Sequence, residues 1–267
     1  MPTAHVNDIT LYYELHGPED GEVLVLSNGI MMSTASWAFQ TPALSKHMRV
    51  LLYDCRGMWQ SDHPGGPFSM EQHADDLAAL LEHLGIAQAH IGGISYGSEV
   101  SMVFALRYPE KTKTLVVIDG VSEVDPILRA TTMPWLLAAE KGDAELLLKS
   151  SIGLNYSAEF IQANEALLYA ALPKFAMLNM TSMVNMMKAF ESYAITDKLS
   201  AIKCPVLLVA GQEDAIKGPK YLKIMAEQIK QAESALVPGA GHALCLEKPG
   251  ILNTLLIGWV LKHGGEN

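Results

Sequence analysis

The chain has 267 residues, of which 49% are hydrophobic and 18% are charged, and its formal net charge is −10. An acidic balance without a basic cluster excludes nucleic acid and an anionic membrane as expected partners. Three cysteines, Cys55, Cys204 and Cys245, lack the spacing of a disulfide framework or a zinc site. The polar first residues do not match a secretory signal, and every apolar run is far shorter than the roughly 20 residues that span a bilayer. We therefore expect a cytoplasmic protein without a metal or another cofactor.

Short apolar runs alternate with helical patterns along most of the chain, which is typical of a mostly parallel sheet flanked by helices. Leucines 77, 80, 81 and 84 have helical spacing, and Ser69 with Gln72 resembles a capping box. The run at 9–14 alternates as a strand of a hairpin does. Further strands are predicted at 22–27, 49–53, 90–94, 114–119, 205–210 and 234–237. The predicted fold class is α/β, with a central sheet whose strands are mostly buried on both faces.

The alternation stops after residue 119 and does not return until about residue 205. The intervening segment has helical composition, so we predict a helical cap at 121–196, inserted after the sixth strand into a core of 1–120 and 197–267. This segment is rich in methionine, whose flexible thioether adapts to varied apolar partners. A methionine stripe at helical spacing also fits simple core packing. We expect the substrate to contact a set of apolar cap residues: Met133, Trp135, Met183 and Met187.

The strongest local pattern is Gly93-Ile94-Ser95-Tyr96-Gly97, which lies between a predicted strand and a helical stretch that begins near Ser98. In a G-x-S-x-G turn the serine adopts a strained backbone conformation, and the glycines leave room where a Cβ would clash. Ser95 is therefore a candidate nucleophile. The amino end of the following helix would place N–H groups near a developing oxyanion.

A serine nucleophile needs a base, and that base needs an orienting acid. His242 lies in a glycine-rich loop after the strand at 234–237, and it is the candidate base. The other histidines read as surface or helix residues. Asp214 follows the strand before it and is the candidate acid, with the adjacent Glu213 and the earlier Asp119 as alternatives.

Two further side chains near these positions each have two interpretations. Glu99 is one helical turn after Ser95, so it is either an acid behind the site or a paired helix residue. Cys245 is three residues after His242, and it either lines the site or is a small buried apolar residue.

The order Ser95, Asp214, His242 along the chain is the order of the α/β-hydrolase arrangement. On these positions the sequence resembles the α/β-hydrolase family over essentially its whole length. The resemblance implies that the oxyanion hole consists of the backbone N–H groups of Ile30 and Tyr96.

Two loops extend the resemblance and also depart from the common pattern. Residues 27–30 read Ser-Asn-Gly-Ile, where most relatives have His-Gly in place of Asn28-Gly29. Residues 54–61 look like the family's D-x-R-G-x-G-x-S loop, but Trp59 replaces the second glycine. We expect Trp59 to alter the wall of the substrate cleft.

The triad predicts a serine hydrolase that cleaves a carboxylic ester of a small, largely apolar substrate through an acyl-enzyme. Ser95 would attack the carbonyl, His242 would move the proton, and Asp214 would orient the imidazole. Carbon–carbon bond hydrolases and perhydrolases use the same triad and stay open as alternatives. Haloalkane dehalogenases need a carboxylate at position 95.

Two alternative functions remain. The 27–29 segment, Trp37 and the 54–62 loop are similar to 3-oxoadipate enol-lactonases, whose substrate carries a carboxylate and would need a cation in the cap. The cap offers several cations: Arg129, Lys141, Lys149, Lys174 and Lys188. The other alternative is a hydrolase-fold receptor that binds a ligand without turnover. The expected partner is a small-molecule ester or lactone, and a homodimer stays open.

Overall fold

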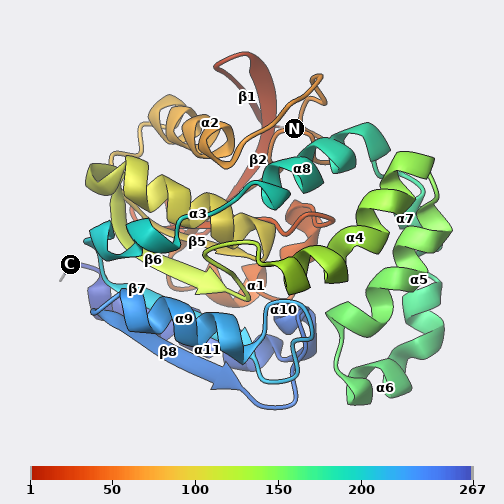
Figure 1. The fold of residues 1–267 in the computed structure, drawn as a ribbon. Helices are drawn as coiled ribbons and strands as arrows, with labels where there is room; N and C mark the ends of the chain where they lie inside the picture. Colours follow the sequence, from red (N-terminus) through yellow and green to blue (C-terminus); the bar gives the residue numbers. More distant parts are fainter. Residues whose placement is uncertain (1, 266–267) are drawn as a thin grey trace.

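The computed structural model describes residues 2–265, which form an eight-stranded sheet in the order β1-β2-β4-β3-β5-β6-β7-β8 (Figure 1). Strand β2 alone runs opposite to the others, and all the pairings among β3 to β8 are parallel, which confirms the predicted mostly parallel sheet. The strands are β1 (Thr3–Val6), β2 (Ile9–His16), β3 (Val23–Ser27), β4 (Arg49–Tyr53), β5 (Ala89–Ile94), β6 (Thr112–Ile118), β7 (Val206–Gly211) and β8 (Ala232–Val237).

Helices cover both faces of the sheet. Since successive side chains of a strand point to opposite faces, each central strand feeds two separate apolar layers. In β3, Val25 belongs to the apolar layer that includes residues of α2, α3 and α9, whereas Leu24 and Leu26 belong to the layer that includes residues of α1 and α11. The helices of the core are α1 (Thr41–Leu44), α2 (Met70–His83), α3 (Tyr96–Arg107), α9 (Pro219–Gln228), α10 (Leu244–Glu247) and α11 (Pro249–His263). Three short 3-10 helices are η1 (Thr34–Trp37), η2 (Pro109–Lys111) and η3 (Thr196–Ala201).

Five helices follow β6 and precede β7: α4 (Pro126–Lys141), α5 (Ala144–Asn155), α6 (Ala158–Tyr169), α7 (Leu172–Phe175) and α8 (Met180–Glu191). Figure 1 shows them in green to teal, beyond the end of the sheet to which the arrowheads of β6 and β8 point. Side-chain caps that accept the N3 amide fix where most of them begin. These caps are Asp125, Asp143, Ser157 and Asn179. The division of the chain into a core and a cap at 121–196 stays a prediction.

The two ends of this helical segment meet in a narrow neck. Glu123 and Ala194 form an isolated antiparallel bridge, the N–H of Ile195 donates to the carbonyl of Ser122, and the N–H of Val124 donates to the carbonyl of Tyr193. The chain therefore leaves the sheet after β6 and returns toward β7 at nearly the same place.

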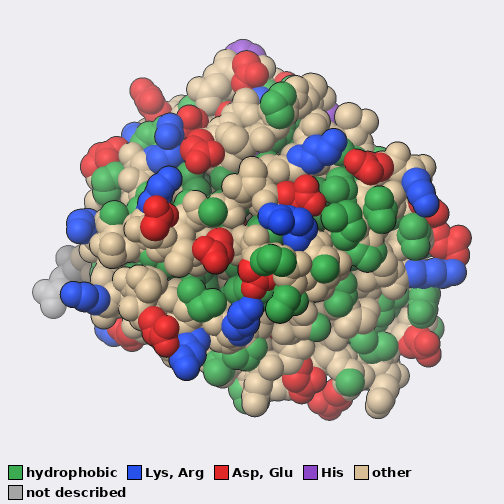
Figure 2. All heavy atoms as spheres, viewed as in Figure 1, with side chains coloured by type: hydrophobic (Ala, Val, Ile, Leu, Met, Phe, Trp, Pro, Cys, Tyr) green, Lys and Arg blue, Asp and Glu red, His purple; other side chains and the backbone are tan. Residues whose placement is uncertain are grey.

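The surface carries both signs of charge. On the face shown in Figure 2, basic side chains are scattered among acidic ones and do not form a continuous patch. Among the helices of residues 2–265, none combines the length and the apolar character that crossing a membrane requires.

Asp125 joins the helical segment to the core. Its Oδ1 accepts from the N–H of Leu128 (2.8 Å) as the N-cap of α4 and from the Tyr221 hydroxyl (3.0 Å), and its Oδ2 lies 2.7 Å from Lys220 Nζ on α9. The hydrogen bond from Lys220, with these further donors, lowers the pKa of Asp125 to about 2. One carboxylate thus serves both a helix end and a contact between two parts of the chain.

We expect Asp125→Ala to lower the free energy of unfolding at pH 7 by about 1 kcal/mol, which is typical of a lost N-cap. Asp125→Asn keeps the cap and should cost less, because Lys220 is exposed and its ion pair is screened by solvent. Since the folded pKa lies below the ordinary value of 3.8, the contribution of the charge is present above about pH 4 and is lost as the pH falls toward 2. Urea unfolding of the three proteins at pH 7 and at about pH 2 measures this. Equal stabilities of Asp125→Ala and wild type at pH 7 would contradict it.

Candidate active site

Ser95 occupies a strained turn between β5 and α3. Its backbone is at φ 54° and ψ −119°, in the left-handed half of the map that non-glycine residues rarely adopt. A Cβ on Gly93 would overlap the carbonyl of Gly97, and a Cβ on Gly97 would overlap the carbonyl of Ser27. The two glycines therefore permit the turn that projects Ser95 from the sheet. Helix α3 begins at Tyr96, directly after the serine and slightly earlier than the sequence predicts.

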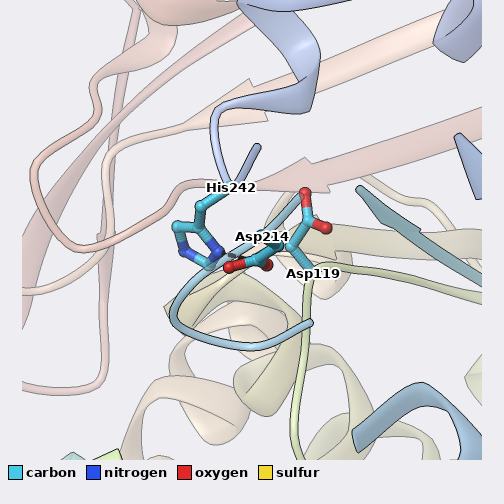
Figure 3. Close-up of side chains that lie close together, drawn as sticks. All are labelled: Asp119, Asp214 and His242. Carbon is cyan, nitrogen blue, oxygen red and sulfur yellow. Dashed lines mark hydrogen bonds and ion pairs between the residues drawn. The ribbon is translucent and has the colours of Figure 1, made fainter. Parts of the chain in front are cut away.

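The structure brings Ser95, His242 and Asp214 together in one hydrogen-bonded chain. Nε2 of His242 lies 2.8 Å from Ser95 Oγ, and Nδ1 lies 2.8 Å from Asp214 Oδ2. Figure 3 shows the imidazole directed at Asp214. The loop after β7 holds the carboxylate, since Asp214 Oδ1 accepts from the N–H groups of Ile216 (2.7 Å) and Lys217 (2.9 Å). With its proton on Nδ1, the imidazole can accept the serine proton at Nε2.

A second carboxyl group, that of Asp119 at the end of β6, lies behind this chain (Figure 3). One oxygen of Asp119, one of Asp214 and one nitrogen of His242 lie within 4.8 Å of one another. Asp119 is fully buried, and its Oδ1 accepts from the N–H of Gly211 (2.8 Å). Its Oδ2 meets no donor among residues 2–265. Within residues 2–265, these three side chains are of the types that can hold a metal ion, but His242 Nδ1 and Asp214 Oδ2 already share a hydrogen bond.

The two carboxyl groups differ in charge. Burial, and then the negative charge of Asp214, raise the pKa of Asp119 well above its ordinary value, which favours the neutral form of Asp119. Burial also raises the pKa of Asp214, but the charge and hydrogen bond of His242 and two backbone N–H donors outweigh it and leave the pKa below its ordinary value. Asp214 is therefore the carboxylate that faces the imidazole, and the geometry favours it over Asp119 as the orienting acid.

Two other acids lie near the site but outside the hydrogen-bonded chain of Ser95, His242 and Asp214. Glu213 is exposed beside Asp214. Glu99 is fully buried, its Oε2 lies 2.6 Å from Lys217 Nζ, and its Oε1 accepts from the N–H of Val121. Of the two interpretations of Glu99, the structure therefore supports that of a paired helix residue. Lys217 both neutralises Glu99 and donates its backbone N–H to Asp214. This role was not predicted, because residues 99 and 217 are far apart in the sequence and meet only in the folded chain.

The loop after β3 places Ile30 near Ser95, and both residues line the same cavity. Asn28, which replaces the histidine of most relatives, holds this loop. Its Nδ2 donates to Asp54 Oδ1 (3.1 Å) and to the carbonyl of Tyr53 (3.0 Å), and its Oδ1 accepts from Trp37 Nε1 (2.8 Å).

The backbone N–H groups of Ile30 and Tyr96 donate no hydrogen bond to another group of residues 2–265. Two free amides near the serine are what an oxyanion hole requires. The side chain of Tyr96 is fixed beneath the turn, where its hydroxyl is hydrogen-bonded to His73 Nε2 at 2.8 Å. His73 is a buried residue of helix α2, in line with its interpretation as a helix residue, whereas His90 is a buried residue of strand β5, which corrects its interpretation. Burial lowers the pKa values of His73 and His90 to about 3 and about 4.

A cavity of about 600 Å³ opens over Ser95 and His242. This volume lies within the usual range for small-molecule sites. The lining includes Trp59 and Trp135, two of the residues predicted to contact the substrate, and Cys245, whose burial raises the pKa of its thiol to about 12. A large apolar part of the lining comes from α5 to α7: Leu148, Ile152, Phe160, Leu167, Leu168 and Phe175.

The predicted methionine contacts are placed differently. Met183 lines a smaller neighbouring cavity of about 190 Å³. Met133 and Met187 line neither cavity; they pack in the core, where α4 and α8 lie against each other. The stripe of Met183, Met186 and Met187 is the buried face of α8, so its helical spacing reflects packing. The sequence could not show this, since a packing stripe and a substrate-facing stripe have the same period.

Of the five cap cations, Lys174 lies in the cavity lining, at an exposed position on α7. The lining contains no Asp or Glu among the described residues. The cavity is thus apolar, with one cation near its mouth and the Ser95–His242 pair at its floor.

Comparison with known proteins agrees with this architecture. Residues 22–249 match the family model described as alpha/beta hydrolase fold. The chain is 31% identical to RutD of Azorhizobium caulinodans, whose name provisionally assigns it carbamate hydrolysis, over 97% of this chain and 98% of that one. The crystal structure of MGS-M2, an alpha/beta hydrolase enzyme from a Medee basin deep-sea metagenome library, is 30% identical, covers 100% of this chain and 99% of its own, and has a TM-score of 0.93.

The protein belongs to the alpha/beta hydrolase fold family. An enol-lactonase from Burkholderia xenovorans LB400 shares the fold, with a TM-score of 0.91 and 24% identity over 97% of this chain and 100% of that one.

The charge difference between the two carboxyl groups leads to a prediction. We expect Asp214→Asn to lower the turnover of p-nitrophenyl butyrate by about 10⁴, because the amide neither holds the tautomer nor stabilises the imidazolium. Asp119→Asn should stay within about tenfold of wild type, since a neutral amide replaces a neutral acid and its oxygen still accepts from Gly211. Measured kcat values, with thermal melts to confirm folding, test this. A loss in Asp119→Asn as large as in Asp214→Asn would show that Asp119 is the working acid.

Proposed function

We propose that this protein is a serine hydrolase that cleaves a carboxylic ester of a small, largely apolar substrate through an acyl-enzyme. The observation that carries the proposal is the continuous chain of two 2.8 Å hydrogen bonds from Ser95 through His242 to Asp214 at the floor of an apolar cavity. Nucleophile, base and orienting acid lie within hydrogen-bond reach before any substrate is bound.

The reaction follows from these positions. Ser95 Oγ attacks the ester carbonyl while His242 Nε2 takes its proton, and Asp214 stabilises the resulting imidazolium. The N–H groups of Ile30 and Tyr96 receive the charge on the carbonyl oxygen. The intermediate collapses, and His242 returns the proton to the departing alkoxide, which leaves as the alcohol. Water then attacks the acyl-enzyme, His242 takes a proton from it and gives one to Ser95, and the carboxylic acid is released.

Carbamate hydrolysis is the second candidate, since the similarity to RutD of Azorhizobium caulinodans extends over nearly the whole chain. The same serine could attack a carbamate carbonyl. A cavity of about 600 Å³ lined mainly by apolar side chains favours the ester, because a simple carbamate of a few atoms would leave most of that space unfilled. Within the cavity, the enol-lactone alternative is favoured by Lys174 near the mouth, where it could face a carboxylate.

We expect Ser95→Ala to lower kcat for p-nitrophenyl butyrate by at least about 10³, because loss of the nucleophile disables the triad as a unit. A fluorophosphonate probe should label the wild type at Ser95 and leave Ser95→Ala unlabelled. Circular dichroism controls for folding. Equal ester turnover by the two proteins would overturn the proposal, and ligand binding without any turnover would favour the receptor alternative.

A substrate panel separates the three reaction types. We expect the highest kcat/KM for short esters, followed by an enol-lactone and an alkyl carbamate, all assayed with wild type and Ser95→Ala. Serine-dependent turnover of a carbamate or an enol-lactone that exceeds the best ester by several orders of magnitude would reverse this ranking.

A further inference from the structure

Two cavities lie on either side of Trp59. The larger contains Ser95, and the smaller, of about 190 Å³, lies between the loop at 57–63 and the beginning of α8. Three residues line both: Ile30, Trp59 and Leu178. Half of the remaining residues that line the smaller cavity are methionines: Met58, Met177, Met183 and Met186. An apolar space therefore adjoins the catalytic cavity on the side of Ile30.

Trp59 is held in a conformation that does not suit its side chain. Its backbone is at φ 37°, in the left-handed region that glycine adopts freely and bulky residues rarely do. Its indole N–H is buried and donates no hydrogen bond within residues 2–265. Lys174 Nζ lies 5.3 Å from the ring centroid, where the ammonium is attracted to the ring. A large ring that persists despite an unfavourable backbone and an unpaired donor points to a function for the ring itself.

The loop that carries Trp59 is fixed at both ends. Before it, Arg56 is buried and donates from Nε to Asp76 Oδ2 (2.8 Å) and from Nη2 to Asp76 Oδ1 (2.9 Å). After it, the N–H of Gln60 donates to Asp54 Oδ2 at 3.1 Å. Asp54 also accepts from Asn28 of the Ile30 loop, so the backbone that carries Trp59 is tied through Asp54 to the loop that carries Ile30. Trp59 thus stands as a fixed partition between the cavities.

We propose that the indole of Trp59 sets the length limit for the apolar group that lies on the Ile30 side of Ser95, and that the smaller cavity is the space which it withholds. The inference rests on the proposed function in that the group belongs to an ester substrate. The wild-type substrate class is then short-chain esters. Flexible thioethers around the smaller cavity would accept a linear alkyl chain if the ring were absent.

The Trp59→Gly variant tests this length limit. Glycine readily adopts a φ of 37°, and loss of the indole ring would join the two cavities. The probes are alkyl fluorophosphonates from ethyl to decyl, with the second-order rate constant for labelling of Ser95 as the readout. We expect the ratio of the decyl to the ethyl rate constant to rise at least about tenfold in Trp59→Gly, as burial of two further methylenes allows. Trp59→Phe, which keeps a ring, should retain the wild-type ratio.

A matched control uses the smaller cavity alone. Met186→Phe narrows that cavity; it should leave the wild-type ratio unchanged and should reverse the gain in the Trp59→Gly background. Thermal melts of each variant verify folding. Calorimetric binding of decanol relative to butanol gives a second readout that needs no reactive serine, and Trp59→Gly should shift that ratio in the same direction by about tenfold.

The outcomes separate the two proposals. If no probe labels Ser95, the proposed function fails, and the alkanol ratio still decides the role of Trp59. If Ser95 is labelled and both ratios in Trp59→Gly equal those of wild type, the partition is wrong and the proposed function stands. A gain in Trp59→Gly that Met186→Phe does not reverse would also overturn it, since the chain would then not enter the smaller cavity.

Discussion

The close approach of α3 to the end of β3 is the constraint on which the site depends. Gly97 lies against the carbonyl of Ser27 so tightly that no side chain fits there. This contact sets the amino end of α3 beside the loop that follows β3, and Ser95 has to turn through a left-handed conformation to connect β5 with that helix. Ile30 and Tyr96, which come from distant parts of the sequence, thereby lie near one serine. A methyl group at position 97 would separate them.

Burial acts on three of the acids around the site, Asp119, Asp214 and Glu99, and their partners decide which charge is favoured. Asp119 has one backbone donor and a charged neighbour, so its neutral form is favoured. Asp214 has two backbone donors and His242, so it is ionised. Glu99 is matched by Lys217, which compensates its desolvation at the cost of burying a cation as well. The fold thus places a single working negative charge behind the imidazole while several carboxyl groups share the same interior.

Local patterns predicted the sheet, the turn at Ser95 and the positions of His242 and Asp214, because each depends on a few adjacent residues and on the end of a strand. The features that were not predicted depend on packing between distant segments. The apolar lining from α5 to α7 has the same composition as any core-facing helix surface, and the methionine stripe of α8 has the same period whether it faces a substrate or the core. Lys217, and the place of Trp59 between two cavities, follow from contacts that no local spacing encodes.

The neck at Glu123 and Ala194 gives the helical segment an unusual independence. Because the two ends of the segment are bridged to each other, the five helices amount to one short connection between β6 and β7. The entropy of closing such a connection grows only slowly with the length of the inserted chain. The residues that would handle the ester bond lie outside the neck, and most of the apolar cavity lining lies inside it. The chemistry and the shape of the substrate can therefore diverge separately in evolution, because a helix beyond the neck can lengthen or rotate without moving a strand.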